Sequence, residues 1–167
     1  CQQNGLDKLK YSSELKSRLS ANLVGDDILF SNNLWNYPAF LAAKLSQERN
    51  LPHIISIRGT LYPWSLAQGK LRKKLAWLVF QKKSLQKASL VHVTCKDEFK
   101  VVRDLGIASP IAIVPHGINY DDYQNLPDKN SAIEQLNLNK GKKYILFMSR
   151  LHKKKGLDLL LGLWPEL

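Results

Sequence analysis

Cysteine is scarce in this 167-residue chain, which contains only Cys1 and Cys95. Two cysteines are too few for a disulfide framework, and neither has the neighbouring ligands that a zinc site requires. The chain also has no run of 18 consecutive apolar residues, so we expect no membrane-spanning helix. These features together predict a cytoplasmic protein in a reducing compartment.

Acidic residues are also few. The chain has 25 lysines and arginines against 14 aspartates and glutamates, which gives a net charge of +11. Such an excess points to an anionic partner, and nucleic acid, an acidic membrane surface and phosphorylated substrates all fit. Charge alone does not choose among these partners.

Several common catalytic patterns are absent. The sequence contains neither the phosphate-loop pattern nor the Gly-x-Gly-x-x-Gly dinucleotide pattern, and it has no Gly-x-Ser-x-Gly nucleophile elbow. Its four histidines, His53, His92, His116 and His152, do not fall at zinc-ligand spacings, so we expect no metal and no cofactor. His53 and His92 lie in or beside apolar runs, and we interpret them as packed residues rather than catalysts.

Short apolar runs alternate with helical patterns along most of the chain. Residues 1–22 predict an amphipathic helix that carries Leu6, Leu9, Leu15 and Leu19. The next patterns predict strands at 28–30, 53–57, 89–93 and 111–114, and helices at 39–49, 69–87 and 96–105. Because these strands are apolar throughout, the pattern predicts an α/β fold: a Rossmann-like parallel sheet with helices on both faces.

The polar segment 118–130 is the best linker candidate in the chain. After it we expect a short helix at 131–136, a fifth strand at 144–148 and a further helix from Gly156. The prediction is therefore two domains, at residues 1–126 and 127–167, of which the second contains only its first strand and helix.

The turn between this fifth strand and its helix is strongly cationic. Arg150 and His152 are followed by three lysines at 153–155. A helix N-terminus already carries a partial positive charge, so each lysine close to it costs about 0.3–1 kcal/mol. A bound anion, of which phosphate is the usual one, would relieve this repulsion. The alternative is a solvated lysine turn.

The predicted helix 69–87 is basic and contains no acid. Its cations are Lys70, Arg72, Lys73, Lys74, Lys82, Lys83 and Lys87. Leu71, Leu75, Leu78 and Leu85 share one face, which we expect to be buried in the domain while the basic side faces anionic lipid headgroups. The alternative is a solvated basic face on an ordinary core helix.

The loop predicted at 60–68 combines a proline with aromatic and hydroxyl side chains. It follows a predicted strand, and open α/β sheets bind ligands at the carboxyl ends of their strands. Together with the cationic turn, this loop fits a phosphate-bearing substrate bound in a cleft between two α/β units.

Four motifs make the chain similar to a known family. They start at Asp27, Ser56, Ile113 and Phe147 and read DILFSNNLWNYP, SIRGTLYPWSL, IVPHGI and FMSRLHKKKGLD. In this order they resemble the motifs of the group 1 (family 4) glycosyltransferases. The resemblance implies the GT-B architecture, in which two Rossmann-like domains flank an active cleft. It also implies retaining transfer of a sugar from a nucleotide-sugar, commonly without a metal, in the synthesis of cell-surface polysaccharides such as lipopolysaccharide.

Matched residue by residue, the resemblance implies that Arg150 and Lys155 hold the donor diphosphate. A guanidinium binds phosphate oxygens in a bidentate fork, and a lysine adds a mobile charge as the leaving diphosphate becomes more negative. His116 and Gly117 match the hinge turn of the cleft, with histidine in place of the family's asparagine. The loops implied to face the acceptor contain Asn33, Trp35, Arg58, Gly59 and Trp64. No catalytic residue is assigned.

The chain also departs from the family pattern. Relatives often carry histidine where Asn32 and Arg58 stand here, so no histidine acts at those positions. The family's glycine-rich first strand would precede residue 1, and its Glu-x7-Glu segment would follow residue 167. We therefore expect an incomplete glycosyltransferase that is inactive by itself.

Two other interpretations stay open. The chain could be a non-enzymatic module that binds an anionic membrane or nucleic acid through residues 69–87, or another GT-B enzyme, such as a sugar-nucleotide epimerase. For the glycosyltransferase, the expected partners are a nucleotide-sugar donor and a glycan or lipid-linked acceptor. Residues 69–87 are expected to contact the inner face of an anionic cell membrane, and no specific nucleic acid is expected.

Overall fold

The computed structural model describes residues 10–166, so Leu6 and Leu9 of the first predicted helix lie outside the described residues. The chain divides into two units, Cys1–Gly117 and Ile118–Leu167, and each is described by itself. This division falls at the start of the predicted linker, and the assignment of domains to 1–126 and 127–167 stays a prediction. Within residues 10–166, no helix has both the length and the apolar character needed to cross a membrane.

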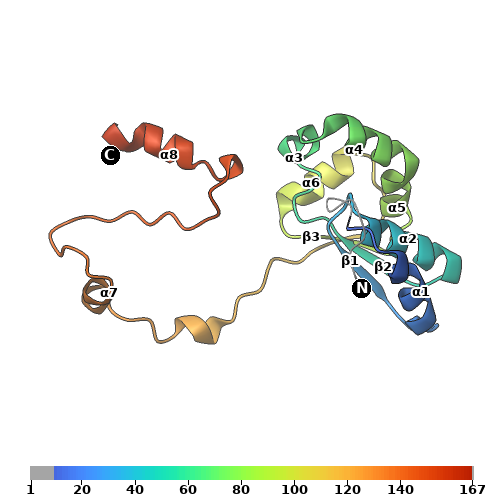
Figure 1. The fold of residues 1–167 in the computed structure, drawn as a ribbon, viewed down its shortest axis with the longest axis horizontal. Coiled ribbons are helices and arrows are strands. Elements are labelled where there is room, and N and C mark those ends of the chain that lie inside the picture. Colours follow the sequence, from blue (N-terminus) through green and yellow to red (C-terminus); the bar gives the residue numbers. More distant parts are fainter. Residues whose placement is uncertain (1–9, 167) are drawn as a thin grey trace. The chain divides into compact units, whose positions relative to one another are not determined.

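The first unit is built on a sheet of four parallel strands that follow one another in chain order (Figure 1). The strands are β1 (Leu29–Asn32), β2 (His53–Ser56), β3 (Leu90–Val93) and β4 (Ile111–Ile113). β-branched and aromatic residues favour the pleated backbone, and every strand lies within two residues of its predicted position. The predicted parallel, Rossmann-like α/β sheet is therefore confirmed.

Helices precede and connect these strands (Figure 1). They are α1 (Ser13–Asn22), α2 (Tyr37–Arg49), α3 (Pro63–Ala67), α4 (Lys70–Ala76), α5 (Lys82–Gln86) and α6 (Lys96–Asp104). Trp77–Gln81 forms a π-helical turn that joins α4 to α5, so the predicted helix 69–87 forms with a wider turn at its middle. The loop predicted at 60–68 instead contains α3, because Pro63 fits the first turn of a helix.

The ends of α2 are determined by local sequence. Asn36 caps the helix by accepting a hydrogen bond on Oδ1 from the Ala39 N–H at 2.9 Å, and Pro38 occupies the first turn. Asn50 ends the helix in the left-handed conformation, with φ 55°, which asparagine tolerates better than most residues. The predicted end at residue 49 is confirmed, and the helix begins two residues before its predicted start at residue 39.

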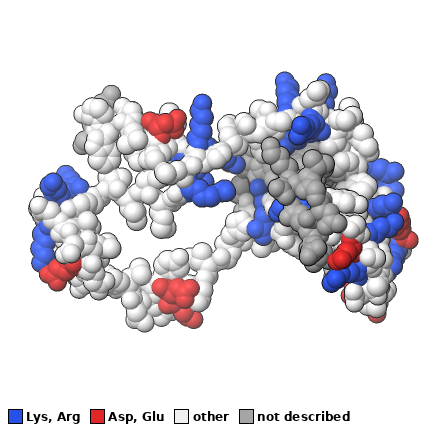
Figure 2. Space-filling view, in the orientation of Figure 1, with Lys and Arg blue, Asp and Glu red and all other residues white. Residues whose placement is uncertain are grey.

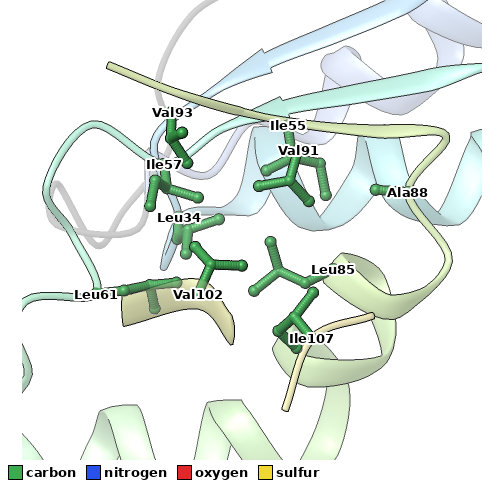
Figure 3. Packing of buried hydrophobic residues seen from close by; sticks show 10 residues of the cluster. All are labelled: Leu34, Ile55, Ile57, Leu61, Leu85, Ala88, Val91, Val93, Val102 and Ile107. Atoms are coloured by element: carbon green, nitrogen blue, oxygen red, sulfur yellow. The ribbon is translucent and has the colours of Figure 1, made fainter. Parts of the chain in front are cut away.

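The main core lies between the sheet and the helices (Figure 3). Ile55 of β2 pairs with Val91 of β3, so both side chains point to the same face, where they join Leu85 of α5 and Val102 of α6. The other members of this cluster are Leu34, Ile57, Leu61, Ala88, Val93 and Ile107. Their burial provides the main hydrophobic stabilisation of the first unit.

A second, smaller cluster covers the same face of the sheet. Leu29 of β1 lies in it with Leu41 and Leu45 of α2, and Leu15 of α1 packs against them. Among the described residues, the helices of both clusters therefore pack on this face. The reason is handedness, because right-handed connections between strands in chain order put every connecting helix on the same side. On the opposite face, Phe30 is 53% exposed.

The basic helix turns a different side to the core from the one that its sequence predicts. Leu85 is fully buried, but the exposed fractions of Leu71, Leu75 and Leu78 are 82%, 64% and 72%. The prediction of a buried face is therefore wrong for these three leucines. A second apolar set on the same helix, which includes Trp77, packs against the core instead.

The second unit contains α7 (Lys129–Gln135), α8 (Leu157–Leu163) and 3₁₀ turns at Tyr120–Tyr123, Lys153–Lys155 and Trp164–Glu166. Asp128 caps α7 and accepts a hydrogen bond from the Ser131 hydroxyl at 2.6 Å, which lowers the pKa of the carboxyl group. The strand predicted at 144–148 does not form, and Leu146 and Met148 are 83% and 87% exposed. A strand needs a neighbour for its backbone groups, and no described residue of this unit forms one.

His53 is a buried titratable residue of the sheet, as the sequence predicts. Its Nε2 lies 2.9 Å from the Ser31 hydroxyl, and burial lowers its pKa from 6.5 to about 4. The folded chain therefore keeps the ring neutral at a pH where the unfolded chain protonates it. The free energy of unfolding therefore keeps its full value above pH 6.5 and decreases as the pH falls toward 4, because the unfolded chain then binds a proton that the folded chain does not.

We expect this loss to lower the free energy of unfolding by up to about 3 kcal/mol between those pH values, with no further loss from His53 below them. Urea unfolding across this pH range measures the slope. The variant His53→Gln should flatten it because glutamine does not titrate, whereas His116→Gln, which changes an exposed histidine, should keep it. Equal slopes in native protein and His53→Gln would contradict the assignment.

Candidate functional site

The loops that follow β1, β2 and β3 begin side by side at one edge of the sheet, because parallel strands present all their carboxyl ends there. The Asn33 N–H donates to the carbonyl of Ser56, the last residue of β2, at 2.8 Å. The Ile57 N–H in turn donates to the His92 carbonyl in β3 at 3.3 Å. The predicted acceptor-side positions Asn33, Arg58 and Gly59 are therefore neighbours on this edge.

Trp35 joins the first of these loops to the second and to the basic helix. Its indole N–H donates to the Thr60 carbonyl, and its backbone N–H donates to Gln81 Oε1, both at 3.4 Å. Its ring centroid lies 6.4 Å from the Trp77 ring and 5.6 Å from Lys73 Nζ, within range of a cation–π interaction. Trp35 is thus held on several sides.

Lys73 is the cation that turns inward from the basic helix. Besides its position over Trp35, its ammonium donates to the Ser65 carbonyl in α3, and burial lowers its pKa. The sequence groups Lys73 with the solvated lysines of this helix, but the structure gives it a packing role. The only sign of this role in the sequence is that Lys73 precedes Trp77 by four residues, a spacing that puts two side chains next to each other on a helix.

Three residues on this edge have positive φ angles, namely Asn33 (68°), Trp35 (66°) and Arg58 (46°). Asparagine adopts this region readily, but for tryptophan and arginine it is uncommon and costs on the order of 1–3 kcal/mol. Gly59 follows with φ 70° at no such cost. Strain concentrated at two neighbouring strand ends marks these loops as candidates for binding, because strain of this kind gathers at functional sites.

Glu98 ties two loops of the edge together. It is 2% exposed, and its Oε1 accepts a hydrogen bond from the Gly59 N–H. Its Oε2 accepts from the Thr94 N–H at 2.6 Å and from the Thr94 hydroxyl at 2.8 Å. The capping-box spacing that ends at Glu98 was the only signal in the sequence, and it does not reveal the contact with Gly59.

Tyr62 and Cys95 form a polar pair beside this tie. The Tyr62 hydroxyl lies 3.5 Å from Cys95 Sγ. This contact is the largest cause of the raised pKa of the phenol and of the lowered pKa of the thiol, as expected where a hydroxyl stabilises a thiolate. Cys95 precedes α6 and is exposed.

The open space at this edge is small. A shallow depression is lined by Ile57, Gly59, Leu61, Tyr62, Glu98 and Val101, and it contains no enclosed space for even a water molecule. The depression therefore does not enclose a substrate by itself. Arg58 is exposed and Trp64 of α3 is 41% exposed, so both present surface to solvent beside it.

The predicted phosphate contacts lie in the second unit. Arg150 and Lys155 are exposed, and Lys155 ends the 3₁₀ turn that precedes α8. The turn is closed by hydrogen bonds from the Lys155 N–H to the His152 carbonyl at 2.8 Å and from the Lys154 N–H to His152 Nδ1 at 3.2 Å. Arg150 lies two residues before this internally bonded turn and five positions from Lys155.

The predicted hinge residues His116 and Gly117 are exposed and begin three residues after the end of β4. They stand at the division between the two units. The described residues contain no group of three or more histidine, cysteine or acidic side chains that could hold a metal ion. The roles predicted for the hinge, the diphosphate contacts and the acceptor-side loops all stay predictions.

Comparison with known proteins gives one match. Residues 3–117 match the family model described as "Glycosyl transferase 4-like domain". This match covers more than half of the chain and ends at the boundary of the first unit. Searches of curated proteins and of solved structures give no match.

Replacing the buried carboxylate tests whether Glu98 holds the edge together. We expect Glu98→Gln to lower the free energy of unfolding by about 1–3 kcal/mol, because the amide cannot accept all of the carboxylate's hydrogen bonds and turns an N–H toward a donor. Hydrogen exchange at the Gly59 and Thr94 amides should accelerate. Asp97→Asn removes the same charge from an exposed neighbour and should change neither quantity. Unchanged exchange at Gly59 in Glu98→Gln would rule out the tie.

Proposed function

The chain belongs to the family of glycosyl transferase 4-like domains, and on that premise we propose that it forms part of an enzyme that moves a sugar from a nucleotide-sugar to a glycan or lipid-linked acceptor. In this reaction the bond between the anomeric carbon and the diphosphate oxygen breaks, and a new bond to an acceptor oxygen forms. The acceptor hydroxyl loses its proton, and a nucleoside diphosphate leaves. We propose that the anomeric configuration is retained.

The observation that carries this proposal is the convergence of the strained loops at the edge of the family-matching unit. Trp35 is anchored there, and Arg58 and Trp64 are exposed beside it. An indole face packs well against the apolar C–H face of a sugar ring, and a guanidinium offers several donors to hydroxyl or phosphate oxygens. We assign these loops, with Asn33 and Gly59, to the acceptor.

Arg150 and Lys155 are assigned to the donor diphosphate. Charge develops on this group as the sugar leaves, and fixed cations at that position lower the barrier. Support comes from their exposure on and just before one short turn and from the fork geometry of arginine, which matches phosphate oxygens. We propose that these cations balance the diphosphate charge without a metal, and that His116 and Gly117 form the hinge between donor and acceptor sides.

The proposal also extends to location. A lipid-linked acceptor in cell-surface polysaccharide synthesis, such as that of lipopolysaccharide, would bring the enzyme to the inner face of the cell membrane. The net charge of +11 and the basic segment 69–87 would support a peripheral contact with anionic lipid. The expected lack of turnover by the 167-residue chain alone stays a prediction.

The alternative is a module that binds nucleic acid or membrane without catalysing a reaction. Nucleic acid binding would depend steeply on salt, because each neutralised phosphate releases a counterion. An epimerase acting on the sugar-nucleotide would use the same diphosphate contacts but would need no acceptor. Release of nucleoside diphosphate only in the presence of an acceptor separates the transferase from both.

The donor assignment is tested by titrating the full chain with inorganic pyrophosphate, the part of the donor that Arg150 and Lys155 would contact. We expect chemical-shift changes at the amides of residues 150–157. The double variant Arg150→Ala, Lys155→Ala should weaken this binding at least about tenfold, because two charge-assisted contacts are lost.

The matched control is the double variant Lys153→Ala, Lys154→Ala, which removes the same charge from the same turn. It should weaken binding less than about threefold, since only the general field changes. Equal losses in the two double variants would show that the turn attracts anions by net charge and would contradict the specific roles of Arg150 and Lys155.

A further inference from the structure

The helix that runs from α4 through the π-helical turn to α5 exposes a stripe of apolar side chains. These side chains are Leu71, Leu75, Leu78 and Val79, with exposed fractions of 82%, 64%, 72% and 68%. Their spacing of four, three and one residues puts them on one side of the helix. Four large apolar groups together on a single helix side form a patch rather than a scatter of single exposed residues.

The opposite side of the same helix is fixed to the domain, so the stripe cannot simply turn inward. Leu85 is fully buried in the main core. Gln81 is 2% exposed and accepts the hydrogen bond from the Trp35 N–H, while Phe80 packs edge-on against Phe40 of α2 at 5.1 Å. Rotating the helix to bury the leucines would break all of these contacts.

Positive charge surrounds the stripe. From Gly69 through Lys87 there are seven lysines and arginines and no acid. Figure 2 shows Lys and Arg side chains in the region where Figure 1 places α4. Lys73 turns inward to Ser65 and Trp35. The ion pairs of the described residues involve Glu14, Glu48 and Glu134, so they leave the charge of this helix uncompensated.

We propose that this outer face is a docking surface for an anionic lipid bilayer. The three leucines and Val79 enter the boundary between headgroups and acyl chains, while the flanking lysines extend their stems and place their ammonium groups among the lipid phosphates. Nucleic acid would complement the positive charge of this face but would leave the leucines in water. An apolar protein groove would bury the leucines but would not complement the surrounding positive charge. A bilayer surface matches both.

This inference deepens the membrane contact of the proposed function and reverses its geometry. The sequence predicts that the apolar side is buried in the domain and that charge alone meets the lipid. The structure instead turns apolar side chains outward, so lipid binding would combine insertion with attraction. The surface does not depend on sugar transfer, because a bilayer would contact it whether or not a donor is bound.

The test is binding of the full chain to vesicles of phosphatidylcholine and phosphatidylglycerol, measured by co-sedimentation. We expect the triple variant Leu71→Gln, Leu75→Gln, Leu78→Gln to weaken binding at least about tenfold, because the insertion is lost while every charge remains. The side chains are exposed, so folding should be unchanged by circular dichroism. The control Val24→Gln, Ile28→Gln changes two apolar residues of similar exposure elsewhere in the unit and should bind as native protein does.

A second arm tests the charge. Lys70→Gln, Lys74→Gln, Lys83→Gln should also weaken binding, and vesicles of phosphatidylcholine alone should bind poorly. Full binding by the leucine variant would overturn the proposal in favour of simple attraction, as would equal binding to neutral vesicles. Self-association of native chain that the leucine variant abolishes, without vesicle binding, would assign the stripe to a second copy and also overturn it.

The pyrophosphate response of residues 150–157 is recorded for the same variants. This response tests whether residues 150–157 bind the donor diphosphate, and it should be the same in all of these variants as in native protein. Loss of vesicle binding with an intact pyrophosphate response, or the reverse, therefore separates failure of the docking surface from failure of the proposed sugar transfer.

Discussion

The structure of the first unit depends on one constraint, which is that its four parallel strands follow one another in chain order. Connections between parallel strands are right-handed, so strands in chain order put their connecting helices on the same face. Because the strands are parallel, their carboxyl ends also share one edge. The edge brings together the loops that carry Asn33 and Arg58 and the first turn of α6, which carries Glu98. The connecting helices in turn can expose only their outer sides to a partner. One topological rule therefore determines where the candidate loops and the outer faces of the connecting helices lie.

Much of this arrangement could be predicted from the sequence. Strand runs rich in isoleucine and valine stand out locally, and Pro38 and Asn50 mark the two ends of α2 through backbone geometry alone. These signals involve only neighbouring residues. The order of the strands and the face that the helices cover depend on contacts across the sheet, which no local pattern contains.

The basic helix shows a second limit. It carries two apolar stripes, one through Leu71 and Leu75 and another through Trp77 and Leu85, and periodicity cannot tell which of them meets the core. In the structure the second stripe faces the core, where Trp35 packs near Trp77 and donates a hydrogen bond to Gln81. The run at 144–148 likewise has strand composition but lacks a neighbouring strand among the described residues. The sequence predicts which loops form the candidate site, but it does not predict the hydrogen bond between Glu98 and Gly59, because these residues are 39 positions apart.

The central claim is that the donor diphosphate meets the turn at Arg150 and Lys155 while the acceptor meets the strained edge of the first unit. Hydrogen exchange measured by mass spectrometry on the chain with a panel of nucleoside diphosphate sugars, with and without glycan or lipid-linked acceptors, tests it most directly. The account predicts that a donor slows exchange within residues 150–157 and that an acceptor slows it at 33–36 and 58–64. Protection confined to other segments when a donor or acceptor binds would contradict it.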